Sequence, residues 1–399
     1  MLLPFTAGDR AVSTLEAAVV FMVVSNEQLD AARMVAEHLP SVATVVNPYT
    51  GVVLPLDEMT GVDRPLGFVI TPRAISAARA AVRRALRVAG GPEPVLVIGQ
   101  DEGTIERVAV TAARKAGARV AILPDGIRTT LRPAGHKGRR SVSLAIDAAD
   151  RTLVAAGILT GRRGDFGSSA PRAIFSWGPG WEAPLQGRAP GALIFNCGCP
   201  RADALAAIPP RPDRGNTLIC SQPLTLPQTA APTDATAAWY EWLADMVRLD
   251  DPRVRVRLHP GERSPRYQLS PALEPLREEP ARSLPEDLAW ADVVLSPYSS
   301  VLVEACGAGR VPISAGSIPI WGTHADNAFL ADPRVASIDF RTSPSLDAVL
   351  DVAAAAEFYV DALRDDYISN VGDAARLTAD AIVSLAAAPS GAVAQARAR

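Results

Sequence analysis

This chain of 399 residues contains only four cysteines and four histidines, and its charged residues nearly cancel to a net charge of −3. A charge so close to zero argues against a nucleic-acid partner, which clustered positive charge would attract. The strongest early apolar run, 17–24, is about eight residues long, whereas a membrane-spanning helix needs about 20. The first ten residues also lack the basic start and apolar core of a signal peptide. These absences together lead us to expect a cytoplasmic protein.

The few cysteines argue against both a disulfide framework and a zinc site. Cys197 and Cys199 are too close in sequence for an unstrained mutual disulfide. Cys220 and Cys306 stand alone, so no second pair completes a set of zinc ligands. We therefore expect reduced cysteines and no bound metal.

What the sequence does contain is a regular alternation of short apolar runs with longer helical patterns. Such alternation is typical of α/β proteins with parallel sheets. The length suits two domains of roughly 200 residues each, and the segment 201–216, rich in Pro, Arg and Asp, is the best candidate linker. We predict two Rossmann-like domains, 1–214 and 215–399, facing each other across a cleft in which a ligand binds.

The predicted elements follow the same pattern in both halves. The predicted strands are 17–24, 42–46, 94–98, 119–123, 173–177, 192–196, 217–221, 254–258, 293–296 and 311–314. The predicted helices are 26–39, 74–89, 104–116, 144–159, 231–249, 299–309, 345–359 and 360–388.

A basic segment, 128–169, interrupts the pattern of the first half. It contains Arg128 and Arg132, several further basic residues and one expected helix, with five glycines outside that helix. One interpretation is a solvated, mobile insertion, since runs of charge usually form solvated faces. The other is a surface that binds the acceptor or the membrane, because loops on rigid scaffolds often carry binding residues.

Ser299 and Ser300 follow the apolar strand 293–296 and open an apolar helix. The free N–H groups and positive dipole at a helix start suit an anion such as phosphate, although serine is also a preferred N-cap. Glu304 comes one turn later among small and apolar neighbours, where a charge needs a partner. A carboxylate there can accept hydrogen bonds from ribose hydroxyls; a solvent-facing helix glutamate is the alternative.

His259 and Pro260 directly follow the strand 254–258, at the same kind of strand end. A histidine there can donate a hydrogen bond or a proton to a leaving phosphate; a purely structural loop histidine is the alternative. His324, in a loop of the second half, is a weaker candidate for this role.

Two acidic turns follow strands of the first half. Asp125 precedes Gly126 after the strand 119–123, and Asp101 lies after the strand 94–98. A carboxylate at either position can remove a proton from an acceptor hydroxyl. The alternative is that each carboxylate only stabilises a turn.

In this order, the motifs resemble those of the bacterial sialyltransferases and polysialyltransferases of the GT-B type, and more widely the capsule and teichoic-acid transferases. The sialyltransferases and polysialyltransferases carry acidic-acidic-Gly, His-Pro and Ser-Ser motifs, whereas the teichoic-acid relatives commonly have His-Gly at the first position. The stretch from Gly198 to Asp203 also resembles one that closes their first lobe, the stretch around Gln222 resembles the strand that opens their second, and Pro285-Glu286 resembles a short motif between His-Pro and Ser-Ser.

The resemblance implies a GT-B-like fold and a role for each matching residue. Asp125 would be the general base, and His259 would hold, and could protonate, the nucleotide phosphate. The other nucleotide-binding residues would be Pro260, Ser299, Ser300, Glu304 and Gln222, while Arg128 and Arg132 are candidates for binding the acceptor. Pro124 stands where the family has its first acidic residue, so only one carboxylate remains.

The resulting hypothesis is an inverting, metal-independent glycosyltransferase with no cofactor beyond its CMP-activated donor, which carries sialic acid, Kdn or Kdo. The acceptor would be a glycan or lipid-linked glycan in surface polysaccharide synthesis, with peripheral contact to the inner face of the cell membrane. The alternatives are a UDP- or CDP-dependent transferase of the teichoic-acid or capsule type, a UDP-sugar epimerase, and a non-catalytic nucleotide-binding scaffold.

Overall fold

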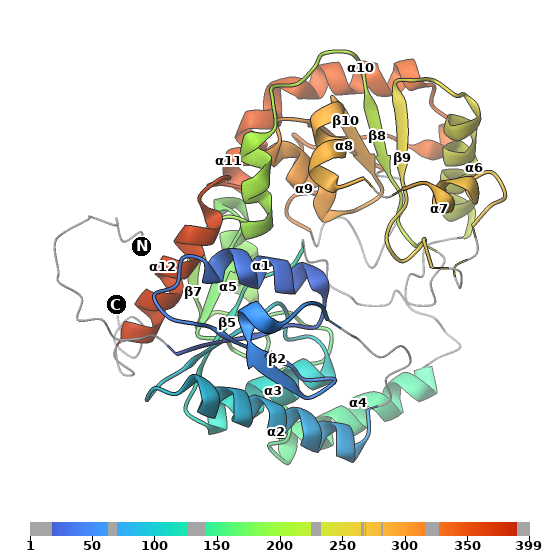
Figure 1. Ribbon diagram of the computed structural model, residues 1–399. Helices are drawn as coiled ribbons and strands as arrows, with labels where there is room; N and C mark the ends of the chain where they lie inside the picture. Colours follow the sequence, from blue (N-terminus) through green and yellow to red (C-terminus); the bar gives the residue numbers. More distant parts are fainter. Residues whose placement is uncertain are drawn as a thin grey trace.

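The computed structural model describes residues 18–62, 70–126, 140–224, 233–264, 267, 269–280, 282–315 and 327–388, with side chains left out at 140–147 and 233–236. Figure 1 shows two lobes, each with a sheet between helices. The first lobe holds a seven-stranded sheet and the second a five-stranded sheet. The prediction of an α/β chain with two parallel-sheet domains is confirmed.

The sheet of the first lobe has the order β3-β2-β1-β4-β5-β6-β7, and all neighbouring strands are parallel except β2 and β3. Its elements are β1 (Val19–Met22), α1 (Asn26–Ala36), β2 (Thr44–Asn47), β3 (Val52–Pro55), η1 (Leu56–Glu58), α2 (Pro72–Ala89), β4 (Val95–Ile98), α3 (Thr104–Lys115), β5 (Arg119–Ile122), α4 (Arg140–Ala155), β6 (Ala173–Ser176), η2 (Pro179–Trp181), α5 (Glu182–Arg188) and β7 (Leu193–Asn196). Strands β1 and β4 are buried at every residue, which matches their continuous apolar sequences.

The sheet of the second lobe has the order β12-β11-β10-β8-β9, and its neighbouring strands are all parallel. The elements after β7 are η3 (Pro200–Ala207), β8 (Thr217–Cys220), α6 (Thr233–Arg248), β9 (Val254–Arg257), α7 (Pro275–Glu278), α8 (Leu284–Trp290), β10 (Val293–Ser296), α9 (Ser300–Gly307), β11 (Val311–Ser314), β12 (Ala336–Ser337), η5 (Phe340–Thr342), α10 (Leu346–Ala356), η6 (Glu357–Tyr359), α11 (Val360–Tyr367) and α12 (Ala374–Ala387). Because β8 lies between β9 and β10, the loops that follow these three strands emerge side by side.

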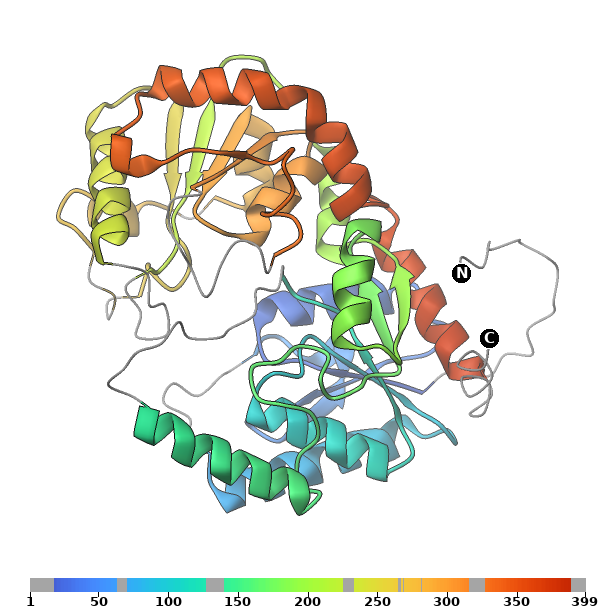
Figure 2. The same cartoon turned by 180° about the vertical axis from the view of Figure 1, so that it is seen from behind.

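The last helix, α12, crosses back and packs on the first lobe (Figures 1 and 2). Its apolar side chains, among them Ala379, Ile382 and Leu385, join the core beneath β1 and α1. The predicted single helix 360–388 is therefore wrong, because the chain breaks between α11 and α12 at 368–373. The predicted domain boundary at residue 214 had assigned this helix to the second domain.

Most predicted elements appear within a few residues of their expected bounds, since local sequence sets their ends. Helix α2 begins where the Thr71 hydroxyl accepts the Ala74 N–H and Pro72 supplies a preset φ, and it ends at Gly90, whose φ is 74°. The helix expected at 144–159 begins and ends four residues earlier, as α4. Strands β3 and β12 and helices α5, α7 and α8 were not predicted, because each has too few residues to show a clear period.

The described part of the basic segment is packed against the first lobe and is not a detached insertion. Figure 2 shows α4 alongside α2 and α3. Arg107, fully buried in α3, pairs with Asp150 of α4 at 2.6 Å and donates hydrogen bonds to the carbonyls of Thr160 and Gly161. Leu159 and Phe166 are also buried. The described basic side chains Arg151, Arg162 and Arg163 are nevertheless exposed, as expected for a solvated face, and Arg128 and Arg132 lie outside the described residues. No helix in the described ranges is long and apolar enough to cross a membrane.

Candidate functional site

Asp125 lies in the loop after β5, and Gln28 of α1 holds its carboxylate. Gln28 Nε2 donates to Asp125 Oδ2 at 2.6 Å, while Gln28 Oε1 accepts the Val24 N–H at 2.9 Å. The second bond fixes the orientation of the amide, so its NH2 group faces the carboxylate. Gly99 makes room for this contact, since a Cβ there would lie 2.3 Å from Gln28 Nε2. The side chain of Asp125 is thus positioned by a buried partner.

Arg201 connects the loop of Asp125 with the second lobe. Its guanidinium donates to the Asp125 carbonyl oxygen at 3.0 Å and lies 3.7 Å from Glu304 Oε1 of α9. Burial alone lowers the pKa of Arg201, but the negative charge of Glu304 and weaker contributions from other groups, Asp125 and Glu27 among them, raise it on balance. Glu304 is only 6% exposed. Arg201 is the partner that the buried charge of Glu304 requires. The contact of Glu304 with ribose stays a prediction.

The stretch 198–203 that carries Arg201 also anchors the C-terminal helix. The Asp203 carboxylate accepts the N–H groups of Gly372, Ala374 and Ala375 at 2.8–2.9 Å, which caps the start of α12. Gly198 has a φ of 93°, and a Cβ there would lie 2.4 Å from the Ser369 carbonyl oxygen. The stretch therefore joins the loop of Asp125, helix α9 and helix α12. The sequence analysis did not predict this role.

His259 lies directly after β9 with its ring orientation set by the backbone. Gly261 N–H donates to His259 Nδ1 at 3.0 Å. An accepting Nδ1 requires the neutral tautomer whose proton is on Nε2, so Nε2–H is a donor. Burial lowers the pKa of His259, and the charge of Glu27 partly opposes this. A neutral imidazole with an Nε2 donor is the form suited to a phosphate oxygen.

Glu262, three residues after His259, was not predicted as part of the site. It is fully buried. Its carboxylate accepts the His259 N–H at 2.9 Å and the hydroxyls of Ser221 and Tyr240 at 3.0 and 2.8 Å. Burial raises the pKa of Glu262, against the effect of these hydrogen bonds. The single proton of the Tyr240 hydroxyl is shared with the carbonyl oxygen of Gln222, which also lies 2.8 Å away. Through Ser221 and His259, Glu262 links the loops after β8 and β9. The available signal was a carboxylate close behind a histidine at a strand end.

Ser299 is the N-cap of α9, since its hydroxyl accepts the Val301 N–H at 3.3 Å. Ser299 therefore has the N-capping role that the sequence analysis gave as the alternative to phosphate binding. Ser299 and Ser300 are half-buried, and Gln222 is buried. The strand order β10-β8-β9 brings the loops of Ser299, Gln222 and His259 to one edge of the second sheet. This edge combines hydroxyls, a helix start and an imidazole, a set that can bind an anion.

Other residues named from sequence have structural roles or lie outside the described residues. Asp101 is fully buried, and its carboxylate accepts the N–H groups of Gly167 and Ser169, so it holds a loop. Glu286 forms a capping box with Ser283 at the start of α8. His324, Arg128 and Arg132 lie outside the described residues.

The cysteines take no part in this site. All four are free and buried, and burial raises the pKa of Cys199 to about 12, which keeps its thiol protonated. In the part of the chain that the structure describes, no cluster of three or more His, Cys, Asp or Glu side chains is placed to hold a metal ion.

Comparison with solved structures identifies the architecture. The chain is similar to a putative UDP-N-acetylglucosamine 2-epimerase from Listeria monocytogenes, with 12% identity and a TM-score of 0.53 over 93% of this chain and 98% of that one. It is also similar to the glycotransferase of kitacinnamycin, with 16% identity and a TM-score of 0.53 over 92% and 98%. A third similar structure is a UDP-GlcNAc 2-epimerase from Neisseria meningitidis bound to UDP-GlcNAc, with 12% identity and a TM-score of 0.50 over 92% and 99%.

These structures share the two-lobed GT-B fold, which this chain therefore has. No protein-family model matches the sequence, and no curated protein matches it significantly.

Proposed function

We propose that this protein is a glycosyltransferase that takes a sugar from a nucleotide-activated donor. The observation that carries the proposal is the path from Asp125 through Arg201 to Glu304. One side chain contacts both the loop of the candidate base and the helix of the candidate phosphate site. A displacement reaction needs its nucleophile and its leaving group handled at the same time.

In the proposed mechanism, Asp125 removes the proton from the acceptor hydroxyl as that oxygen attacks the anomeric carbon. Gln28 holds the carboxylate in place for this step. The bond from the anomeric carbon to the phosphate oxygen breaks, and the electron pair leaves with the nucleotide. His259 Nε2–H, the serines at the start of α9 and the helix dipole stabilise the added negative charge. The displacement inverts the anomeric configuration. Hydrogen-bond donors of the protein stabilise the negative charge on the leaving phosphate.

For the donor we propose a CMP-activated sugar acid of the sialic acid, Kdn or Kdo type. Support comes from the combination of an acidic-Gly turn, His-Pro and Ser-Ser at strand ends that lie on the two sheets of a GT-B fold. For the acceptor we propose a glycan or lipid-linked glycan, and we place the reaction at the cytoplasmic side of the membrane.

The second candidate is a UDP- or CDP-dependent transferase or a UDP-sugar epimerase. Two of the similar structures are described as UDP-N-acetylglucosamine 2-epimerases, one of them with UDP-GlcNAc bound. The position of Arg201 also favours a neutral sugar, because Glu304 already balances this cation.

A nucleotide screen by thermal unfolding separates these candidates. Ligand at 100 times its Kd stabilises the folded state by about 2.7 kcal/mol, enough to raise Tm by several degrees. CMP is expected to raise Tm more than UDP or CDP, and transfer is then assayed with the donor of the preferred nucleotide. Preference for UDP or CDP would favour the second candidate, and product analysis without acceptor would reveal an epimerase. Nucleotide binding without turnover of any donor would indicate a scaffold.

A further inference from the structure

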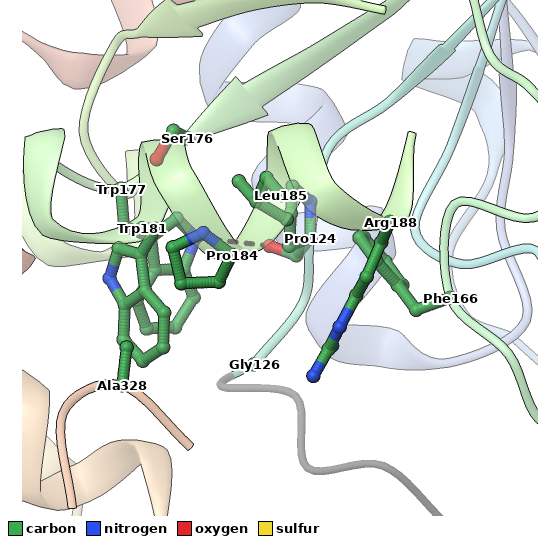
Figure 3. A pocket seen from close by; sticks show the side chains of 10 residues that line it. All are labelled: Pro124, Gly126, Phe166, Ser176, Trp177, Trp181, Pro184, Leu185, Arg188 and Ala328. Atoms are coloured by element: carbon green, nitrogen blue, oxygen red, sulfur yellow. Dashed lines mark hydrogen bonds between the residues drawn. The ribbon is translucent and has the colours of Figure 1, made fainter. Parts of the chain in front are cut away.

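A small apolar pocket lies beside the loop of Asp125 and has no role in the mechanism above. Its wall includes Pro124, Gly126, Trp177, Trp181, Leu185 and Ala328 (Figure 3). Two of these residues, Pro124 and Gly126, are the chain neighbours of Asp125. Since consecutive Cα atoms are about 3.8 Å apart, the pocket wall comes within one residue of the proposed base.

The aromatic walls of the pocket are held in fixed positions. Trp177 Nε1 donates to the Pro124 carbonyl at 3.1 Å, and Trp181 Nε1 donates to the Tyr367 carbonyl at 2.9 Å. The Trp181 ring also meets the edge of Tyr367, with centroids 5.3 Å apart. With both indole N–H groups used inside the protein, the rings present carbon surface to the pocket. The pocket is thus preformed and selects apolar groups.

The polar lining groups leave this apolar character intact. Ser176 Oγ donates to the Gly178 carbonyl at 2.8 Å and so is engaged within its own turn. Figure 3 shows Arg188 beside Phe166 on one side of the pocket, with the two tryptophans on the other. Ala328 belongs to the segment before β12, so both lobes contribute to the wall.

The size of the pocket limits its occupant. It encloses a volume of about 40 Å³, and a water-sized group takes roughly 10–15 Å³ by the same measure. About three such groups fit, which is enough for an acetyl group and too little for a sugar ring.

We infer that this pocket binds the methyl end of the acetyl group of an N-acetylated acceptor sugar, with the polar amide at the open side of the pocket, an assignment that rests on the proposed transferase function. The acetyl methyl lies between the tryptophan faces, and the sugar ring outside the pocket reaches toward Asp125. An acceptor without the acetyl group leaves the apolar walls in contact with water. The pocket therefore determines which acceptors are used.

Saturation-transfer NMR on the whole protein tests this assignment with N-acetylglucosamine, glucosamine and glucose as probes. Among the protons of N-acetylglucosamine, the acetyl methyl should receive the strongest saturation, and the two sugars without an acetyl group should give a several-fold weaker signal. Leu185→Trp fills the pocket from α5 and should reduce the methyl signal several-fold. Ala328→Leu, which fills it from the other lobe, serves if the first variant fails to fold. Gly187→Ala on the same helix is the control, since nothing lies within 4 Å of a Cβ there.

Equal signals from the three sugars, or an unchanged methyl signal in either correctly folded variant, would overturn the assignment. The nucleotide-induced rise in Tm is measured on the same samples. If it persists while the acetyl preference is absent, the pocket assignment alone fails. If no nucleotide raises Tm, the proposed function fails.

Discussion

The guanidinium of Arg201 lies 3.7 Å from the carboxylate of Glu304. Arg201 follows a strand of the seven-stranded sheet, whereas Glu304 follows a strand of the five-stranded sheet. Arg201 belongs to η3 after the last strand of the first lobe, and Glu304 to α9 in the second lobe. The same guanidinium donates to the Asp125 carbonyl. Arg201 therefore joins α9 to the loop of the proposed base.

The variant Arg201→Gln is expected to lower kcat more than it raises KM for the donor. It leaves Glu304 buried without its partner and frees the Asp125 loop, and a misplacement of about 1 Å costs roughly 10²-fold in rate. Steady-state kinetics at saturating donor measure the effect. Arg201→Lys should recover only part of the rate, because an ammonium group cannot reproduce the planar guanidinium contacts.

A double variant separates this positioning role from general loss of stability. Arg201→Gln combined with Glu304→Gln removes the unpaired charge and should regain Tm while kcat stays low. Arg211→Gln is the matched control, since Arg211 lies in the same linker and pairs with Asp213 and Glu357 near the surface. If Arg211→Gln lowered kcat as much as Arg201→Gln, the positioning role would be wrong.

Asp125→Asn is expected to reduce transfer by about 10²–10⁴-fold, the usual contribution of a general base. An amide cannot take the acceptor proton, although it retains an oxygen that can accept from Gln28. The nucleotide-induced rise in Tm should be unchanged, because the proposed phosphate site is on the other lobe. Asp361→Asn, on the exposed face of α11, is the control. Full activity of Asp125→Asn would remove this residue as the base.

The strand-end positions of Asp125, His259 and Ser299 could be predicted because each follows a continuous apolar run, and such runs become buried parallel strands. The hydrogen-bond partners of these residues could not. Gln28 and Asp125 are far apart in sequence, and their contact depends on β1 and β5 both flanking β4. Composition and periodicity carry no information about that order.

The course of the C-terminal helix was also beyond sequence reasoning. Periodicity shows that α12 has an apolar face, but not which sheet covers it. The determining contacts, Gly198 against Ser369 and Asp203 at the start of α12, join residues more than a hundred positions apart. The sequence predicted that Glu304 needs a partner for its charge, but only the fold shows that this partner is Arg201.

The stability of the second lobe is expected to depend on the protonation of His259. Its pKa is lowered by burial, so the unfolded chain binds this proton more readily than the folded one. The stabilising effect is present above the ordinary value of 6.5 and is lost as the pH falls through the lower folded pKa. Protonation of Nδ1 would also turn the acceptor of the Gly261 N–H into a donor.

His259→Asn tests this effect, because its side-chain oxygen can accept the Gly261 N–H without titrating. The wild type should lose Tm relative to the variant as the pH falls below about 6.5, the ordinary pKa of the imidazole. Glu262 is unchanged in both proteins, so its titration largely cancels in the difference. A difference in Tm that does not vary with pH would contradict the prediction. Transfer activity of the variant should also fall, since it lacks the Nε2 donor.

Gly198→Ala is expected to destabilise the junction between the lobes and α12. Its φ of 93° alone costs a residue with a Cβ roughly 1–3 kcal/mol, and the added Cβ would lie 2.4 Å from the Ser369 carbonyl and 2.8 Å from Ala374 Cβ. Since both contacts are with the segment that begins α12, hydrogen exchange should rise first in α12 and α1, which pack together. Gly187→Ala is the matched control, because an alanine in that helix meets no neighbour and gains roughly 0.5–1 kcal/mol. A protection loss confined to the second lobe would show that Gly198 does not anchor the C-terminal helix.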